Sequence, residues 1–273
     1  TTTLCVSASA SGIVTVNPIP TVTVNSPTVC AGATATVTAT PGAAGTYSYA
    51  WTVPAGAPAP GNVSTFTAAV AGTYSVIITN TVTTCVSAIA SGTVTINPLP
   101  TATVNSPGIC AGTPASVTAS PGVAGTYSFA WTVPAGATNP GSVSTFTTLI
   151  AGTYSVVLTN TTTGCIGASA SGTVTVDPLP TATVNSPTVC AGTPAAVAAT
   201  PGSVGTYSYA WTVPAGATAP GNVPSFTTTI AGTYSVILTN TVTGCIGLSY
   251  SGIVTINPVP TVTVNSPTVC AGT

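Results

Sequence analysis

The chain has no lysine, arginine, histidine or methionine among its 273 residues, and Asp177 is its single acidic residue. General acid–base catalysis near neutral pH needs side chains whose pKa can be tuned to that range, and these are missing. Serine and threonine are abundant, but no histidine or lysine is present to activate a hydroxyl group as a nucleophile. These absences indicate that the chain is not an enzyme and has no catalytic residues.

The missing charges also exclude several kinds of partner. Nucleic acid needs lysine or arginine to neutralise its phosphates, and a calcium site needs several carboxylates. We therefore expect no nucleic-acid partner, no metal site and no cofactor. Mean hydropathy is +0.61, but no apolar run approaches the ~20 residues that span a bilayer, so we expect no membrane insertion of this segment. With almost nothing to titrate or screen, stability should depend little on pH and salt.

The cysteines show that the chain is repetitive. One series recurs with a constant period in residue number (110 − 30 = 80), and a second series has the same period; they are Cys30, Cys110, Cys190 and Cys270, and Cys5, Cys85, Cys165 and Cys245. The constant period and the similarity between the repeats predict that the chain is a window of a longer tandem array. Its parts are the end of a preceding repeat (1–20), three full repeats (21–100, 101–180 and 181–260) and the start of a following repeat (261–273).

Each repeat has the pattern of a small β domain. Alternating residues and turn signals in the first full repeat predict strands over 21–25, 33–40, 46–53, 63–68, 73–80 and 85–96, the last with a bulge at Ser91-Gly92. The segment 54–62, rich in proline and glycine, is expected to be a long crossover that contains at most a short edge strand. Six or seven short strands in each repeat predict an all-β fold of tandem Greek-key sandwiches of the immunoglobulin type, arranged head to tail.

Two sets of aromatic residues are expected in the core of these sandwiches. The tryptophan that follows Tyr-Ser-Tyr-Ala or Tyr-Ser-Phe-Ala lies where an immunoglobulin-like fold places its core tryptophan, and a tyrosine early in the 73–80 strand fits the tyrosine-corner position. These residues are Trp51, Trp131, Trp211, Tyr74, Tyr154 and Tyr234.

Three motifs in the same order suggest a family. Tyr-Ala-Trp-Thr-Val-Pro-Ala-Gly (49–56), Ala-Gly-Thr-Tyr-Ser-Val-Ile-Ile-Thr-Asn (71–80) and the Cys-Ala-Gly and Gly-Cys or Thr-Cys motifs recur in the repeats. They resemble the PKD-like (polycystic-kidney-disease-type) domains of large Bacteroidota surface proteins, including gliding-motility adhesins. One departure is that Thr-Val-Pro-Ala-Gly replaces the acidic, glycine-rich segment after the tryptophan, so no calcium role is carried over. The resemblance implies a secreted, surface-anchored protein that a dedicated outer-membrane route exports.

The cysteines are expected to form disulfides in an oxidising compartment, since no histidine is present to complete a zinc site. Two pairings are open. Within a repeat, the bonds would be Cys30–Cys85, Cys110–Cys165 and Cys190–Cys245; between repeats, they would be Cys30–Cys165 and Cys110–Cys245. In the expected sandwich, Cys30 and Cys85 lie at opposite ends of a strand, roughly 25 Å apart, which is too far for a disulfide. The pairing between repeats is therefore favoured.

Three hypotheses for function follow. The leading one is a stalk or filament segment of a large extracellular surface adhesin, which supplies length and mechanical stability through contacts between neighbouring repeats. The alternative is a glycan- or surface-binding module that uses exposed aromatic residues; Tyr47, Tyr49 and Trp51 are the candidates in the first full repeat. A third is the association of identical chains in a fibre, which the uncharged surface would not oppose.

Overall fold

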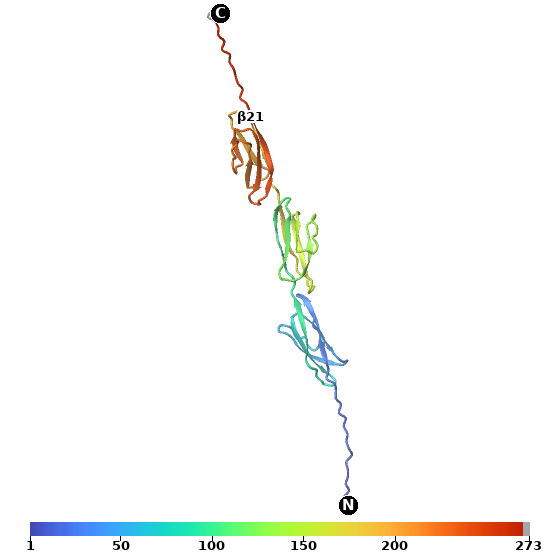
Figure 1. The fold of residues 1–273 in the computed structure, drawn as a ribbon. Coiled ribbons are helices and arrows are strands. Elements are labelled where there is room, and N and C mark those ends of the chain that lie inside the picture. Colours follow the sequence, from blue (N-terminus) through green and yellow to red (C-terminus); the bar gives the residue numbers. More distant parts are fainter. Residues whose placement is uncertain (270–273) are drawn as a thin grey trace. The chain divides into compact units, whose positions relative to one another are not determined.

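A computed structural model describes residues 1–269, which contain strands and turns but no helix (Figure 1). The described residues fall into two compact units. The first comprises Thr1–Ala102, Pro121–Ser128 and Val157–Ala168, and the second comprises Thr103–Ser120, Phe129–Val156 and the described residues from Ser169 onward. Cys270 and the three residues after it lie outside the described part. Neither 1–20 nor 261–269 contains a strand.

The same set of seven strands occurs three times, with the period of the cysteines. The first set is β1 Val22–Val24, β2 Thr28–Cys30, β3 Ala35–Pro41, β4 Tyr47–Thr52, β5 Thr65–Ala68, β6 Gly72–Asn80 and β7 Ala90–Asn97. The second is β8 Ala102–Val104, β9 Gly108–Cys110, β10 Ala115–Pro121, β11 Tyr127–Thr132, β12 Thr145–Thr148, β13 Gly152–Asn160 and β14 Ala170–Asp177. The third is β15 Ala182–Val184, β16 Thr188–Cys190, β17 Ala195–Pro201, β18 Tyr207–Thr212, β19 Ser225–Thr228, β20 Gly232–Asn240 and β21 Ile246–Asn257.

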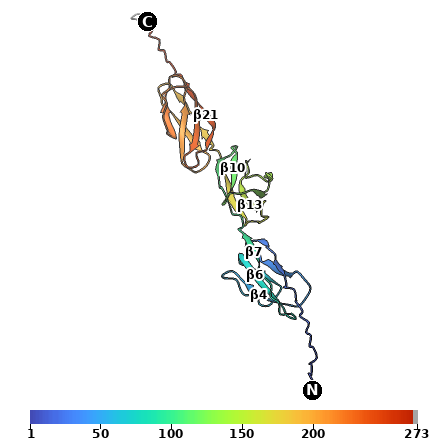
Figure 2. The same ribbon diagram turned by 60° about the horizontal axis from the view of Figure 1, so that its bottom comes forward.

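Each set forms two sheets. In the first, a three-stranded sheet has the order β1-β3-β5 and a four-stranded sheet has the order β2-β7-β6-β4. Figure 2 shows β7, β6 and β4 following one another in this order. Buried residues of both sheets share one core cluster, including Val37 of β3, Tyr74 of β6 and Val94 of β7, so the sheets pack face to face. The prediction of an all-β fold of tandem immunoglobulin-like sandwiches is confirmed.

Alternating burial explains why these segments become strands. Along β3, Ala35, Val37 and Ala39 are buried while the threonines between them are more exposed, and along β6 Tyr74, Val76 and Ile78 are buried. Successive side chains of a strand point to opposite faces, so a two-residue period places all apolar residues on the core side. Threonine on the outer face combines high strand propensity with solubility in a chain that lacks charges.

The first predicted strand, 21–25, contains β1, and β2 is a further short strand after it that the sequence did not predict. β1 pairs antiparallel with β3, and the chain then crosses to the other sheet, where β2 pairs in parallel with β7. Asn25 supports the crossing: its side-chain amide donates to the carbonyl of Thr36 (2.9 Å), and its side-chain oxygen accepts from the amide of Thr38 (2.8 Å). One side chain thus supplies the hydrogen bonds that a continuing strand would have supplied.

The bulge predicted at Ser91-Gly92 is wrong. Tyr74 pairs with Gly92 and Ser75 with Ser91 in unbroken register. Glycine is needed there because a Cβ on Gly92 would overlap the backbone carbonyl oxygen of Asn25, where the chain crosses between sheets. In the third set the register shift lies elsewhere, between Ile237 and Thr239 of β20.

Candidate functional site

Two disulfides are the chain's most distinctive chemical feature. Cys30 is bonded to Cys165 and Cys110 to Cys245, with Cα atoms 5.6 and 5.5 Å apart and a sequence separation of 135 in both cases. The structure therefore has the pairing between repeats and not the pairing within a repeat. Each bond lies inside one of the two compact units. By the chain-entropy model, closing a loop of this length contributes about 5 kcal/mol to stability.

The first cysteine of each pair is held by a parallel strand pair. Cys30 ends β2 and faces Asn97, the last residue of β7, and the amide of Ala31 donates to the Asn97 carbonyl at 2.8 Å. Cys110 ends β9 in the same way and faces Asp177 of β14. Asp177, the only charged side chain of the sequence, is therefore a residue at a strand end beside a disulfide.

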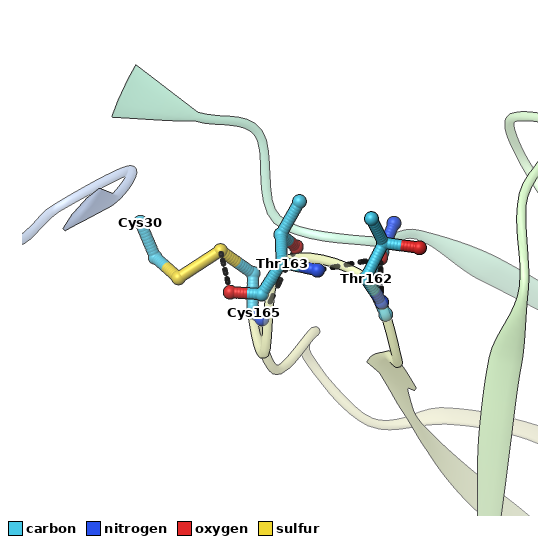
Figure 3. The surroundings of a disulfide bond; sticks show 5 residues. Cys30, Thr162, Thr163 and Cys165 are labelled. Atoms are coloured by element: carbon cyan, nitrogen blue, oxygen red, sulfur yellow. Dashed lines mark hydrogen bonds between the residues drawn. A yellow bond between two sulfur atoms is a disulfide. The ribbon is translucent and has the colours of Figure 1, made fainter. Parts of the chain in front are cut away.

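The second cysteine of each pair lies in a tight turn after β13 or β20. The Asn160 side-chain oxygen accepts from the amides of Thr162 and Thr163 (2.9 and 3.1 Å), and the Asn160 amide donates to the Cys165 carbonyl at 2.9 Å. Figure 3 shows Cys165 joined to Cys30, with its sulfur 4.0 Å from the Thr163 carbonyl oxygen. Because the turn uses short local hydrogen bonds, it fixes the cysteine independently of its partner.

One residue of this turn has positive φ, which gives a stability prediction. Gly164 and Gly244 have φ of 72° and 74°, whereas the equivalent Thr84 has φ of 60° and is β-branched. Replacing Thr84 with glycine should relieve strain and stabilise the first sandwich by about 1 kcal/mol, and Gly164→Thr should destabilise the second by a similar amount. Chemical denaturation followed by the fluorescence of Trp51 or Trp131 measures both. Thr84→Ala is the control, since it keeps a Cβ and should change little; an equal gain from alanine would show that strain is not the cause.

A glycine two residues after the cysteine makes a contact that sequence reasoning missed. A Cβ on Gly167 would overlap the carbonyl oxygen of Pro100, and one on Gly247 would overlap that of Pro180, so the turn packs directly on the linker before its own repeat. Both prolines are buried. In the first repeat Ser87 has this position, and its hydroxyl accepts from the Ile78 amide at 3.0 Å. The Cys-Ile-Gly sequence that recurs in two of the three full repeats could have indicated this contact.

The two bonds overlap along the chain, because Cys110 lies between Cys30 and Cys165. A covalent path from Cys30 to Cys245 crosses the first bond to Cys165, returns to Cys110 and crosses the second bond. Only the segment from Cys110 to Cys165 lies on this path, whereas the polypeptide itself runs through every residue from 30 to 245. Residues 31–109 and 166–244 are off the path, and strands β3–β8 and β14–β20 lie in these two bypassed segments.

The predicted core tryptophans pack within their sandwiches. Trp51 meets Phe66 edge to face at 4.9 Å between ring centroids, and its indole N–H donates to the Val63 carbonyl at 2.9 Å. Trp131 and Trp211 have the same pair of contacts. Trp131 is buried, while Trp51 and Trp211 are partly exposed. Both the ring and the indole N–H are engaged by the fold, which leaves little of these residues for a ligand.

The predicted corner tyrosines are fully buried and donate to the carbonyl four residues upstream. The partners are Val70 for Tyr74 (2.9 Å), Ile150 for Tyr154 (2.9 Å) and Ile230 for Tyr234 (3.0 Å). Burial raises the pKa of Tyr74, which keeps its hydroxyl protonated and able to donate. The sequence places these residues in a structural role.

The remaining aromatic candidates are partly exposed. Tyr47 donates from its hydroxyl to the Ala43 carbonyl at 3.1 Å, and Tyr49 lies on the same strand. In the third repeat, Tyr207 and Tyr209 line a pocket with the turn at 201–205. Among residues 1–269, no group of three metal-ligating side chains comes together. The same part of the chain holds no helix that is long and apolar enough to span a membrane.

Comparison with known proteins gives a likeness to solved structures alone. No family model matches the chain, and no curated protein matches it. Titin domains I67-I69 (an E-to-A variant) align with 14% identity over 87% of this chain and 98% of that one, with a TM-score of 0.46. The eight N-terminal Ig domains of DSCAM isoform 1.30.30 align with 14% identity over 88% of this chain and 37% of that one, with a TM-score of 0.49. Extracellular domains 3–5 of Drosophila OTK align with 11% identity over 85% of this chain and 94% of that one, with a TM-score of 0.39.

Proposed function

We propose that the chain is a load-bearing stalk segment of a secreted protein, whose work is to supply length that resists tension. The observation that carries this proposal is the overlap of the two disulfides. Under tension the load follows the shortest covalent path, so strands β3–β8 and β14–β20 lie in segments that the bonds relieve of load. The paired cysteines also favour an oxidising, extracellular setting.

Composition supports the same role. A surface with a single charged side chain has almost no ion pairs that salt or pH could weaken, and the absence of lysine and arginine leaves no cleavage site for trypsin-like proteases. These properties suit a segment that stays exposed outside the cell. Attachment to the surface of a Bacteroidota cell, as part of an adhesin of the gliding-motility type, is the finer version of this proposal and is based on the motifs of the sequence.

Repeated stretching tests the proposal. A chain tethered by its two ends is stretched and released many times, and the work lost per cycle is measured before and after a reducing agent is added. With the bonds intact, the loss should be small, because only the residues between Cys110 and Cys165 can be drawn out between the bonds. Reduction of the two disulfides should increase the work lost per cycle severalfold. Equal losses before and after reduction would contradict a load-bearing role for the bonds.

Glycan binding is the second candidate, and the pocket beside Tyr207 and Tyr209 is the observation that favours it. Partly exposed tyrosines can stack on sugar rings. The structure offers less for this role than for the stalk, because the Tyr207 hydroxyl already contacts the Ser203 hydroxyl at 2.8 Å.

A further inference from the structure

A pocket of about 450 Å³ lies between the linker before the third sandwich and two turns of that sandwich, all within the second compact unit. Its lining comes from the linker, from the turn after β17 with the start of β18, and from the turn after β20. The lining includes Asp177, Leu179, Ser203, Tyr207, Asn240 and Thr243. Pockets for small molecules measure roughly 300–1,000 Å³, so this volume suffices for a small ligand.

A hydrogen bond and the second disulfide hold the walls of this pocket together. The amide of Gly202 donates to the Thr181 carbonyl at 2.8 Å, which ties the turn after β17 to the linker. On the other side, Asp177 faces Cys110 across the β14–β9 pair, and Cys110 is bonded to Cys245 in the turn after β20. The fold therefore forms the pocket before any ligand binds.

Asp177 brings an uncompensated negative charge to the pocket. Its carboxylate is the single charged side chain of a sequence without lysine, arginine or histidine, so no side chain of these 273 residues can neutralise it. The residue is partly buried. Withdrawing a charge from water is unfavourable unless an opposite charge or hydrogen bonds compensate it. A cation from outside the chain would supply this compensation.

The first linker has the same frame but lacks the carboxylate. One period earlier in the sequence, Asn97 is equivalent to Asp177, and Val123 is equivalent to Ser203. In both repeats the first tyrosine of the following strand donates from its hydroxyl to the carbonyl of the turn residue, at 3.0 Å for Val123 and 3.2 Å for Ser203. The second linker thus differs by a carboxylate and a hydroxyl that line one pocket.

We propose that this pocket binds a primary ammonium group on an aliphatic chain, the group that a lysine side chain and a free alkylamine share. An ammonium group donates three hydrogen bonds, and the pocket has acceptors on three segments, the Asp177 carboxylate and the Ser203 and Thr243 hydroxyls. The aromatic ring of Tyr207 attracts cations, and Leu179 gives the methylene chain an apolar contact.

A divalent metal ion fits the same pocket less well. Calcium takes several carboxylate or carbonyl oxygens, and among residues 1–269 no three metal-ligating side chains come together. The ammonium site goes beyond the stalk role and does not depend on it, because the stalk role is based on the path of the two disulfides.

Titration followed by NMR tests the proposal. The chain with both disulfides formed is labelled with nitrogen-15 and titrated at low ionic strength with butylamine and, separately, with acetyl-lysine methylamide. The amide signals of Asp177, Val204 and Thr243 should shift and saturate, while the amides of Asn97 and its neighbours serve as an internal control and should not. Equal binding of both compounds would show that a free amine suffices, whereas tighter binding of the lysine compound would indicate the lysine of a partner protein.

Asp177→Asn is the matched variant, because the first linker has asparagine at the equivalent position. It keeps the shape of the side chain and removes the charge, so amine binding should weaken by about tenfold or more. Conversely, Asn97→Asp/Val123→Ser should give the first linker a site that binds butylamine. Folding of each variant is checked by the two disulfides and by the dispersion of the amide signals.

Three outcomes would overturn the proposal. The first is that neither amine gives saturable shifts at the pocket. The second is an unchanged affinity in Asp177→Asn, which would mean that the carboxylate takes no part in binding. The third is equal binding of butan-1-ol, which has the same chain length without the charge and would show that apolar contact alone explains the shifts.

Discussion

Pulled by its two ends without reductant, the chain should extend between Cys30 and Cys245 by no more than the contour length of the segment from Cys110 to Cys165, about 190 Å. After reduction, the same interval should reach the contour length of the whole polypeptide from residue 30 to residue 245, about 750 Å. The roughly fourfold difference follows from the overlap of the two bonds, because the shortest covalent path between the two cysteines uses both. Force spectroscopy measures this length as the total contour length released when the chain is fully extended.

Breaking one bond at a time provides the matched controls. In Cys30→Ser/Cys165→Ser, the path runs from residue 30 to Cys110 and across the remaining bond, so one full period of the repeat can extend, about 280 Å. In Cys110→Ser/Cys245→Ser, the path crosses from Cys30 to Cys165 and continues to residue 245, which is again one period and about 280 Å. Pairing within repeats would leave no bond in either variant, because the within-repeat partners of the two remaining cysteines are replaced, and both variants would then release about 750 Å. The remaining four cysteines are replaced by serine to prevent disulfide exchange.

A chain that releases its full contour length between residues 30 and 245 without reductant would show that neither bond forms. Release of more than about 280 Å but less than about 750 Å in the unreduced chain would indicate a different pairing. The lengths expected for the intact chain, the two single-bond variants and the reduced chain therefore identify the connectivity as well as its mechanical effect.

The second large effect is expected from Gly172→Ala. Gly172 lies in β14, opposite Tyr154 of β13, and a Cβ there would overlap the carbonyl oxygen of Asn105, where the chain crosses between sheets. Backbone atoms cannot move aside as the end of a flexible side chain can, so the crossing or the strand pair must shift. We expect a loss of about 3 kcal/mol in the free energy of unfolding of the second sandwich. Denaturation is followed by Trp131 fluorescence in a Trp51→Phe/Trp211→Phe background.

Gly108→Thr is the control in the same repeat. Gly108 is in β9, and the equivalent residues in β2 and β16 are Thr28 and Thr188. A Cβ on Gly108 would meet only the Thr175 hydroxyl, at 3.1 Å. We expect a change within about 0.5 kcal/mol. Equal losses in both variants would mean that the cost does not come from the overlap at Asn105.

The crossing between sheets explains why parts of the fold escaped prediction. Alternation over 21–25 predicted the strand β1, but not that the chain then crosses to the other sheet and forms β2, with Asn25 supplying hydrogen bonds at the crossing. Gly92 suggested a bulge for the same reason. A glycine in a strand indicates either a bulge or the close approach of another backbone, and only the position of the crossing chain distinguishes the two.

By itself, the sequence determined the period of the repeats, the all-β class and the buried face of most strands. These features are local, because the two-residue alternation of Ala35, Val37 and Ala39 places them on one face regardless of what covers that face. The absence of ionisable side chains likewise needs no structure to be interpreted. The missing lysine, arginine and histidine follow directly from composition.

The sequence favoured the pairing between repeats but left two pairings open, and the tertiary structure decided which cysteines meet. Cys85 is much nearer to Cys30 in the sequence than Cys165 is, yet the structure bonds Cys30 to Cys165, at a sequence separation of 135. The reason is that pairing depends on which strand ends lie together: Cys30 ends β2, and the turn after β13 that carries Cys165 packs through Gly167 on the linker at Pro100. The contacts that bring these ends together join residues of successive repeats, and no pattern within a single repeat contains them.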